Sequence, residues 1–128
     1  MRGQVRVILA LLALLGWLDP LQAKGDPDAI ATPPVELVVF ESSDCAYCLI
    51  FRKNIARYYP SMPQGRTAPM RFVQIEDTAS AGLVLREPIS IAPTAVLIRN
   101  GREIDRIVGY TGPDLFFDLI NHLLARGD

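Results

Sequence analysis

The chain has 128 residues and is close to electrical neutrality, with 13 lysine and arginine residues, 14 aspartate and glutamate residues and a net charge of −1. Because nucleic-acid binding relies on a clustered excess of basic residues, this balance of charges gives no indication of DNA or RNA binding. The length predicts one small domain built around a single apolar core.

Residues 1–23 are predicted to form a cleavable signal peptide. A short basic start precedes an apolar run over residues 7–18, which a helix-breaking Asp-Pro pair ends. The run falls short of the roughly 20 apolar residues that span a bilayer, and Ala23 offers the small residue that precedes a cut. An uncleaved N-terminal anchor is the alternative. We therefore expect export to the periplasm without stable membrane insertion after cleavage, and a disordered lead-in over residues 24–34.

The two cysteines of the chain, Cys45 and Cys48, follow an apolar, β-branched run over residues 35–40. That run is typical of a strand buried on both faces. A helix that starts at Cys45 directs free N–H groups at its sulfur, which favours the thiolate. Cys48 lies on the same face of the first turn, where its thiol can displace a mixed disulfide. The pair therefore predicts thiol–disulfide exchange, with Cys45 as the nucleophile and Cys48 as the resolving thiol.

The remaining elements alternate between helices and strands, in the order β-α-β-α-β-β-α. Polar residues 42–44 supply N-cap candidates for the first helix, in which Arg52 belongs to a solvated face. An Asn-Gly turn at residues 100–101 predicts a hairpin. The pattern predicts a helix over residues 45–59, a loop over 61–69, a strand over 70–75, a short helix over 78–86, strands over 95–98 and 103–108, and a helix from Pro113.

The last helix carries a broad apolar face, which predicts that it covers the sheet. The residues of this face are Leu115, Phe116, Leu119, Ile120, Leu123 and Leu124. We predict that Tyr110 and Phe117 are packing residues as well.

This order of elements resembles the thioredoxin superfamily over residues 35–126, with a CxxC pair at a helix start and a Pro-Thr pair before a later strand. The resemblance implies an α/β, thioredoxin-like fold with a central mixed four-stranded sheet flanked by helices. It implies that the Ala92-Pro93 peptide bond is cis and lies against the disulfide. Tyr47, Ala92 and Pro93 are accordingly the expected substrate-binding residues, with the Ala92 backbone available to an extended peptide.

Within the superfamily, the chain resembles the small exported proteins encoded with bacterial sulfur-oxidation genes. The segment over residues 68–71 and the Gly109-Tyr110 pair contribute to this resemblance. It implies a thiol reductase for the cysteine of a sulfur-carrier protein in the periplasm. It also implies a membrane-bound thiol carrier as the electron donor, because a reductase in an oxidising compartment needs a source of electrons.

The chain departs from many thioredoxins at the position of a buried carboxylate, six residues before the first cysteine. Val39 stands at that position, and Glu41 is the nearest substitute as a proton acceptor. The alternative for Glu41 is a solvated acid at the strand end. No cation separates the cysteines and Asp44 precedes them, so we expect a Cys45 pKa near the ordinary roughly 8.5 and a reducing poise.

Other functions need different ligands or surfaces. Zinc requires three or four protein ligands, and His122 is the only histidine, so we expect no zinc site. For the reductase we expect no metal and no organic cofactor. A copper(I) chaperone that uses both thiolates stays open, as does a peptide-binding module without redox turnover. The arginines at 99, 102 and 106 form either a docking site for an acidic partner or a solvated sheet edge.

Overall fold

The computed structural model describes residues 33–126. The predicted signal peptide, and the lead-in up to residue 32, lie outside the described residues. None of the helices in residues 33–126 is long and apolar enough to cross a membrane.

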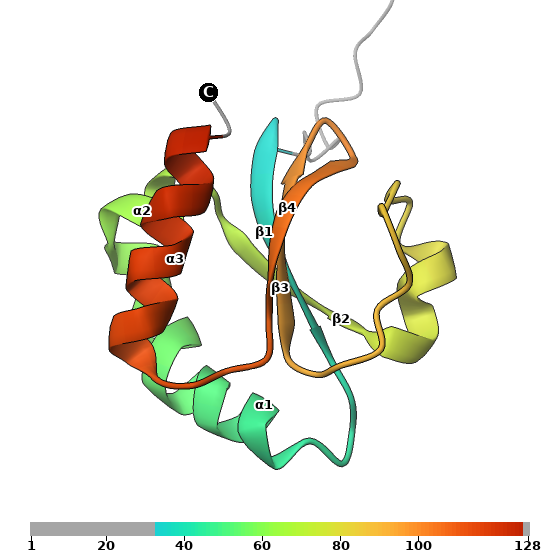
Figure 1. Cartoon of the computed structure of the whole chain (residues 1–128), viewed down its shortest axis with the longest axis horizontal. Helices are drawn as coiled ribbons and strands as arrows, with labels where there is room; N and C mark the ends of the chain where they lie inside the picture. The colour runs from blue at the N-terminus through green and yellow to red at the C-terminus, as the bar shows by residue number, and fades with distance from the viewer. Residues whose placement is uncertain (1–32, 127–128) are drawn as a thin grey trace, which may run out of the picture. The chain divides into compact units, whose positions relative to one another are not determined.

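A four-stranded mixed sheet runs through the domain (Figure 1). Its strands are β1 (Val35–Glu41), β2 (Met70–Gln74), β3 (Thr94–Arg99) and β4 (Arg102–Val108), arranged in the order β2-β1-β3-β4. Strand β1 pairs in parallel with β2 and antiparallel with β3, and β4 continues antiparallel beside β3. The predicted α/β fold with a central mixed sheet is confirmed.

Both faces of β1 are buried, as its sequence predicts. Leu37 and Val39 face the side that carries α1 and α3, where they join one apolar cluster with Phe51 of α1. Val38 and Phe40 face the opposite side, where they pack with Ile89. The alternation follows from the two-residue period of a strand, and it also turns Glu41 toward the α1 side.

The first helical region is less regular than predicted. Helix α1 (Ala46–Phe51) passes into a π-helical turn, η2 (Arg52–Ala56), and a 3-10 turn, η3 (Tyr59–Ser61), follows. The predicted uninterrupted helix to Tyr59 is therefore wrong, and the proline at position 60 lies inside η3 instead of ending the helix. A proline is tolerated in a first helical turn because its missing N–H would have no helical partner there.

A second helix, α2 (Pro63–Thr67), replaces the predicted loop over residues 61–69. Pro63 and Gly65 are typical turn residues, but Pro63 occupies the first helical position, which suits its fixed φ. Gly65 is required by packing, since a Cβ at this position would collide with the backbone carbonyl of Tyr59. Pro63 and Gly65, which predict a loop, thus belong to a tightly packed short helix.

The predicted helix over residues 78–86 is also wrong. A 3-10 helix, η4 (Ile75–Ser80), follows β2, and Gly82 with φ of 68° then turns the chain. This positive φ favours glycine and breaks helical geometry. The chain reaches β3 without another helix, on the side of the sheet opposite α1 and α3 (Figure 1).

The Asn-Gly hairpin and the terminal helix confirm two predictions, with one correction. Asn100 and Gly101 have φ values of 50° and 76°, as the predicted two-residue turn requires.

Helix α3 (Pro113–Arg126) packs against β4, the edge strand. Its apolar face is narrower than predicted, because a helix over a sheet edge leaves one flank in solvent. Phe116, Ile120 and Leu123 are buried, whereas Leu115 and Leu119 are exposed.

Candidate active site

Cys45 and Cys48 form a disulfide at the start of α1, with 5.2 Å between their Cα atoms. Cys45 itself is the N-cap residue, so none of the polar residues 42–44 takes that role. Cys45 is partly exposed, whereas Cys48 is only 4% exposed. The pair thus offers one sulfur to an incoming molecule and keeps the other inside the protein.

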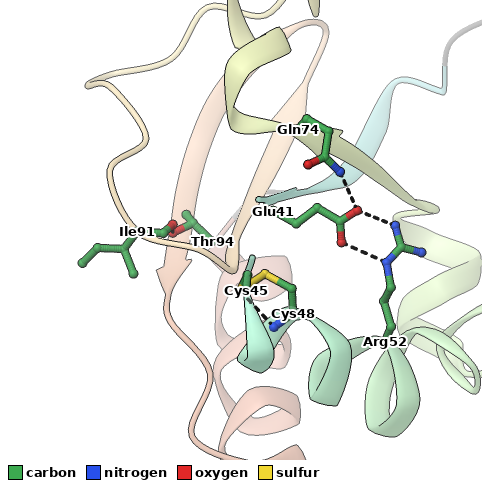
Figure 2. The surroundings of a disulfide bond; sticks show 7 residues. All are labelled: Glu41, Cys45, Cys48, Arg52, Gln74, Ile91 and Thr94. Atoms are coloured by element: carbon green, nitrogen blue, oxygen red, sulfur yellow. Dashed lines mark hydrogen bonds and ion pairs between the residues drawn. A yellow bond between two sulfur atoms is a disulfide. The ribbon is translucent and has the colours of Figure 1, made fainter. Parts of the chain in front are cut away.

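The backbone of α1 interacts directly with the outer sulfur. The Cys48 N–H lies 3.0 Å from the Cys45 Sγ and donates a hydrogen bond to it. In the reduced protein the same N–H can stabilise a negative charge on that sulfur, because a hydrogen bond to the ionised form favours ionisation. Figure 2 shows this contact beside the disulfide. The geometry favours Cys45 as the attacking thiolate.

The Ala92-Pro93 segment leaves the sheet at the same end as the cysteines. Thr94 pairs with Phe40 in the register of β3 and β1, so residues before Thr94 and residues after Glu41 emerge together. The Ala92-Pro93 peptide bond is cis, as the resemblance implies. Ala92 is partly exposed and Pro93 is buried. Figure 2 includes the neighbouring residues Ile91 and Thr94 in the surroundings of the disulfide.

Tyr47 faces a different part of the surface. Its side chain is 61% exposed and lines a shallow pocket of about 270 Å³ between α1 and the loop from β4 to α3. Ile50 and Tyr110 also line this pocket, whereas Ala92 and Pro93 do not. Ala92 and Pro93 therefore lie together, whereas Tyr47, the third predicted substrate-binding residue, lines a separate pocket next to the cysteines.

Glu41 is buried and ion-paired at the end of β1, with only 7% of its surface exposed. Its carboxylate accepts hydrogen bonds from Arg52 Nε at 2.9 Å and Nη2 at 2.6 Å, and from Gln74 Nε2 at 2.9 Å (Figure 2). The interpretation of Glu41 as a solvated acid is wrong, because the strand stays regular up to this residue and turns it toward α1.

Arg52 is a neighbour of the site that the sequence pattern did not indicate. Its guanidinium lies 3.7 Å from the centroid of the Phe72 ring, in addition to the two bonds with Glu41. The hydrogen bond and the charge of Glu41 raise the pKa of Arg52, although burial opposes this rise. The amphipathic pattern placed Arg52 on a solvated face, and its side chain is indeed 46% exposed. Only the β1–β2 pairing brings Phe72 and Gln74 to it.

Arg106 is neither a solvated edge residue nor a free docking group, which corrects that prediction. Its side chain is 11% exposed and its Nε lies 2.6 Å from the buried carboxylate of Glu103. The predicted packing role of Tyr110 is confirmed, because its ring packs edge-on against Phe51 with 5.4 Å between centroids. In the part of the chain that the structure describes, no three metal-ligating side chains come together.

Comparison with protein families gives the class of the molecule. A family model described as a thioredoxin-like domain matches residues 31–124, so the chain belongs to the thioredoxin-like family. Thioredoxin-like proteins are generally thiol–disulfide oxidoreductases that act on cysteine-containing proteins. The Cys45–Cys48 pair at a helix start provides the redox centre that this chemistry requires.

The chain is also similar to solved structures within this family. The chain is similar to the periplasmic thioredoxin SoxS from Paracoccus pantotrophus in its reduced form, with 34% identity and a TM-score of 0.71. The match covers 73% of this chain and 99% of that one. A thioredoxin-like protein from Edwardsiella tarda, with 23% identity, a TM-score of 0.55 and coverage of 70% and 84%, shows the fold alone. Comparison with curated protein sequences gives no match.

Proposed function

We propose that the chain is a periplasmic protein disulfide reductase that keeps the cysteine of a partner protein in usable form. The observation that carries this proposal is the unequal exposure of the two sulfurs, combined with the N–H of Cys48 at the outer one. A reductase needs one accessible thiolate for attack and one protected thiol for release. The similarity to a periplasmic thioredoxin supports the compartment.

The reaction balances as two consecutive exchanges. The Cys45 thiolate attacks one sulfur of the substrate disulfide, which forms a mixed disulfide and expels the second substrate sulfur as a thiolate. The Cys48 thiol loses its proton and attacks Cys45 Sγ, which forms the Cys45–Cys48 disulfide and releases the first substrate sulfur. The substrate gains two electrons, and the chain loses two. A dithiol donor must then reduce the chain again.

Substrate would bind as an extended segment beside the redox centre. Ala92 is a partly exposed residue whose backbone is the proposed hydrogen-bonding edge, and Pro93 holds it near Cys45. Tyr47 would contact the side chain next to the substrate cysteine. The proposed partner is a sulfur-carrier protein of a sulfur-oxidation system, and the proposed electron donor is a membrane-bound thiol carrier, as the resemblance in sequence implies.

The reduction potential of the Cys45–Cys48 pair tests the direction of electron flow. We expect a value below about −200 mV, because no cation lies between the cysteines to stabilise the reduced thiolate strongly. Equilibration of the purified chain with graded glutathione and dithiothreitol buffers, followed by alkylation of free thiols, measures it. A potential near −120 mV, which is typical of a strong oxidant, would contradict the reductase proposal.

Glu41 is proposed as the acceptor of the Cys48 proton in the second exchange. The substitution Glu41→Gln removes the charge but keeps the shape of the side chain, so we expect resolution of the mixed disulfide to slow about tenfold at pH 7. The difference from the wild type should shrink above about pH 9, where the thiol ionises without help from a base. Rapid mixing of the reduced chain with a model disulfide, with acid quenching at intervals, measures this rate as a function of pH.

The matched control is Glu36→Gln, at the opposite end of β1. Glu36 is likewise buried and is ion-paired with Arg71, whose Nε lies 2.6 Å from its carboxylate. This variant loses an equivalent buried charge far from the cysteines and should keep the wild-type rate. Equal rates for both variants and the wild type at pH 7 would leave Glu41 with a purely structural role.

A further inference from the structure

The segment that delivers Ala92 to the active site has no regular secondary structure between η4 and β3. Its apolar contacts come from Ile89, which is buried, and from Leu83 and Leu85, which are partly buried against the same cluster. Such a segment opens at a low free-energy cost unless other contacts hold it. Two sets of contacts join it to β4.

The first set is a short backbone bridge. The Val84 N–H donates to the Gly101 carbonyl at 2.8 Å, and the Glu103 N–H donates to the Val84 carbonyl at 3.0 Å. This bridge fixes the beginning of the segment over the hairpin. It lies eight positions before Ala92 in the sequence and cannot by itself fix the end of the segment.

The second set is a buried ion pair. The carboxylate of Glu103, whose side chain is 1% exposed, lies 2.6 Å from both Nε and Nη2 of Arg106 and accepts the Arg86 N–H at 2.8 Å. Arg106 Nη2 also donates to the Glu87 carbonyl at 3.0 Å. The ion pair therefore holds the segment at two consecutive backbone positions. Glu103 binds the Arg86 N–H, and Arg106 binds the Glu87 carbonyl.

The electrostatics fit a permanent ion pair. Burial alone would raise the pKa of Glu103, but the hydrogen bonds from Arg106 and from the Arg86 N–H hold that pKa below its ordinary value. Glu103 consequently keeps its charge at neutral pH. A charged, bidentate pair has strict geometry, which an apolar contact of the same size would not impose.

The ion pair also reaches the active-site end of the segment. Arg106 lines a cavity of about 400 Å³ together with Ile91 and Thr94, the residues that flank the Ala92-Pro93 bond. Thr94 Oγ1 donates to the Ile91 carbonyl at 2.7 Å, and the Gly109 N–H donates to the Pro93 carbonyl at 2.8 Å. Arg106 thus borders the same cavity as the turn next to the disulfide, and these two hydrogen bonds hold that turn.

We propose that Glu103 and Arg106 are positioning residues for the substrate: they hold the segment over residues 84–93 on β4, so that Ala92 meets an extended substrate at Cys45. The inference rests on the proposed function, since it assigns the segment to substrate binding. Neither residue touches the reacting sulfurs. Their removal should therefore affect protein substrates and leave the chemistry of the cysteines intact.

The test uses the double variant Glu103→Leu/Arg106→Leu. Removing both charges leaves no unpaired charge inside the protein, and such apolar replacements of ion pairs usually fold. The matched control is Glu36→Leu/Arg71→Leu, which removes an ion pair with one buried partner from β1 and β2, whose hydrogen bonds join Glu36 and Arg71 to each other and not to the segment. Arg106→Lys serves as a second variant, since it keeps the charge but loses the fork that binds Glu103 and Glu87 together.

Two substrates separate positioning from chemistry. The reduced chain is mixed with insulin, a protein disulfide, or with hydroxyethyl disulfide, which is too small to span the segment. For the double variant and for Arg106→Lys we expect the insulin rate constant to fall about tenfold, and that for hydroxyethyl disulfide to stay within about twofold of the wild type. Both rates of the control should match the wild type, and the reduction potential of all variants should be unchanged.

Hydrogen exchange gives a readout that does not depend on turnover. The amides of Arg86, Glu87 and residues 89–92 should exchange at least about tenfold faster in the double variant than in the control. Unchanged exchange would overturn the anchoring, and faster exchange with an unchanged insulin rate would overturn its role in substrate binding. Equal loss with both substrates would likewise contradict positioning. A wild-type chain that reduces neither disulfide would instead refute the proposed function, while the exchange result still decides the anchoring.

Discussion

Replacing the outer thiol, as Cys45→Ser, should lower the reduction of protein disulfides by at least about 1,000-fold, because a hydroxyl cannot replace the attacking thiolate. Replacing the buried thiol, as Cys48→Ser, should allow the first exchange and stop the second. The mixed disulfide then accumulates, since a serine at position 48 has no thiol to attack Cys45 Sγ and release the substrate. Gel shifts without reductant, followed by mass spectrometry of the trapped partner, measure both outcomes.

The control for trapping is the double variant Cys45→Ser/Cys48→Ser, which should capture no partner. Partner binding that survives Cys45→Ser at wild-type strength would favour a peptide-binding module without turnover. Tight copper(I) binding by the reduced wild type, lost in both single variants and accompanied by no disulfide exchange, would favour a metal chaperone. Trapping through Cys45 in the Cys48→Ser variant, instead, is the result expected of a reductase.

Truncating Phe51 should cause the largest loss of stability among single changes near the site. Phe51 is 1% exposed, and its ring packs edge-on against three others, with centroid distances of 5.1 Å to Phe116, 5.4 Å to Tyr110 and 6.4 Å to Phe72. Phe51→Ala should lower the free energy of unfolding by about 3–5 kcal/mol. The corresponding fall in the melting temperature is about 15 °C or more.

Thermal and urea unfolding of the oxidised protein measure this effect. Ile50→Ala is the matched control, because Ile50 precedes Phe51 on α1 but is 44% exposed. It should cost less than about 1 kcal/mol. A similar loss in both variants would mean that α1 is held by its helix contacts in general and not by the aromatic cluster. The distinction matters for function, since the ring of Phe51 fixes the helix that carries both cysteines.

Local sequence signals determined the elements that depend on neighbouring residues. The continuous apolar, β-branched run identified β1, the helical period of the apolar residues identified α3, and the Asn-Gly pair identified the hairpin. The CxxC spacing located the redox pair, because residues three apart meet within one helical turn. These features follow from short-range geometry, so one sequence suffices to predict them.

Local signals failed where a distant partner decided the conformation. Pro63 and Gly65 indicated a loop, but these residues form a short helix in which Gly65 packs so closely on the backbone carbonyl of Tyr59 that a Cβ would collide with it. A helix was predicted over residues 78–86, where the segment is instead tied to β4 through Val84 and Arg86. Helical periodicity carries no information about such cross-links.

The pattern of amino acids was enough to establish the fold class, the redox pair and the order of the strands along the chain. Which charges are buried around that pair depends on the folded arrangement. Glu41 meets Arg52, and Glu103 meets Arg106 while also holding Arg86, through strand register and the path of the chain. The physical reason is that burying a charge costs free energy unless the charge has a partner. Which residue becomes that partner depends on neighbours in three dimensions, and sequence spacing does not encode them.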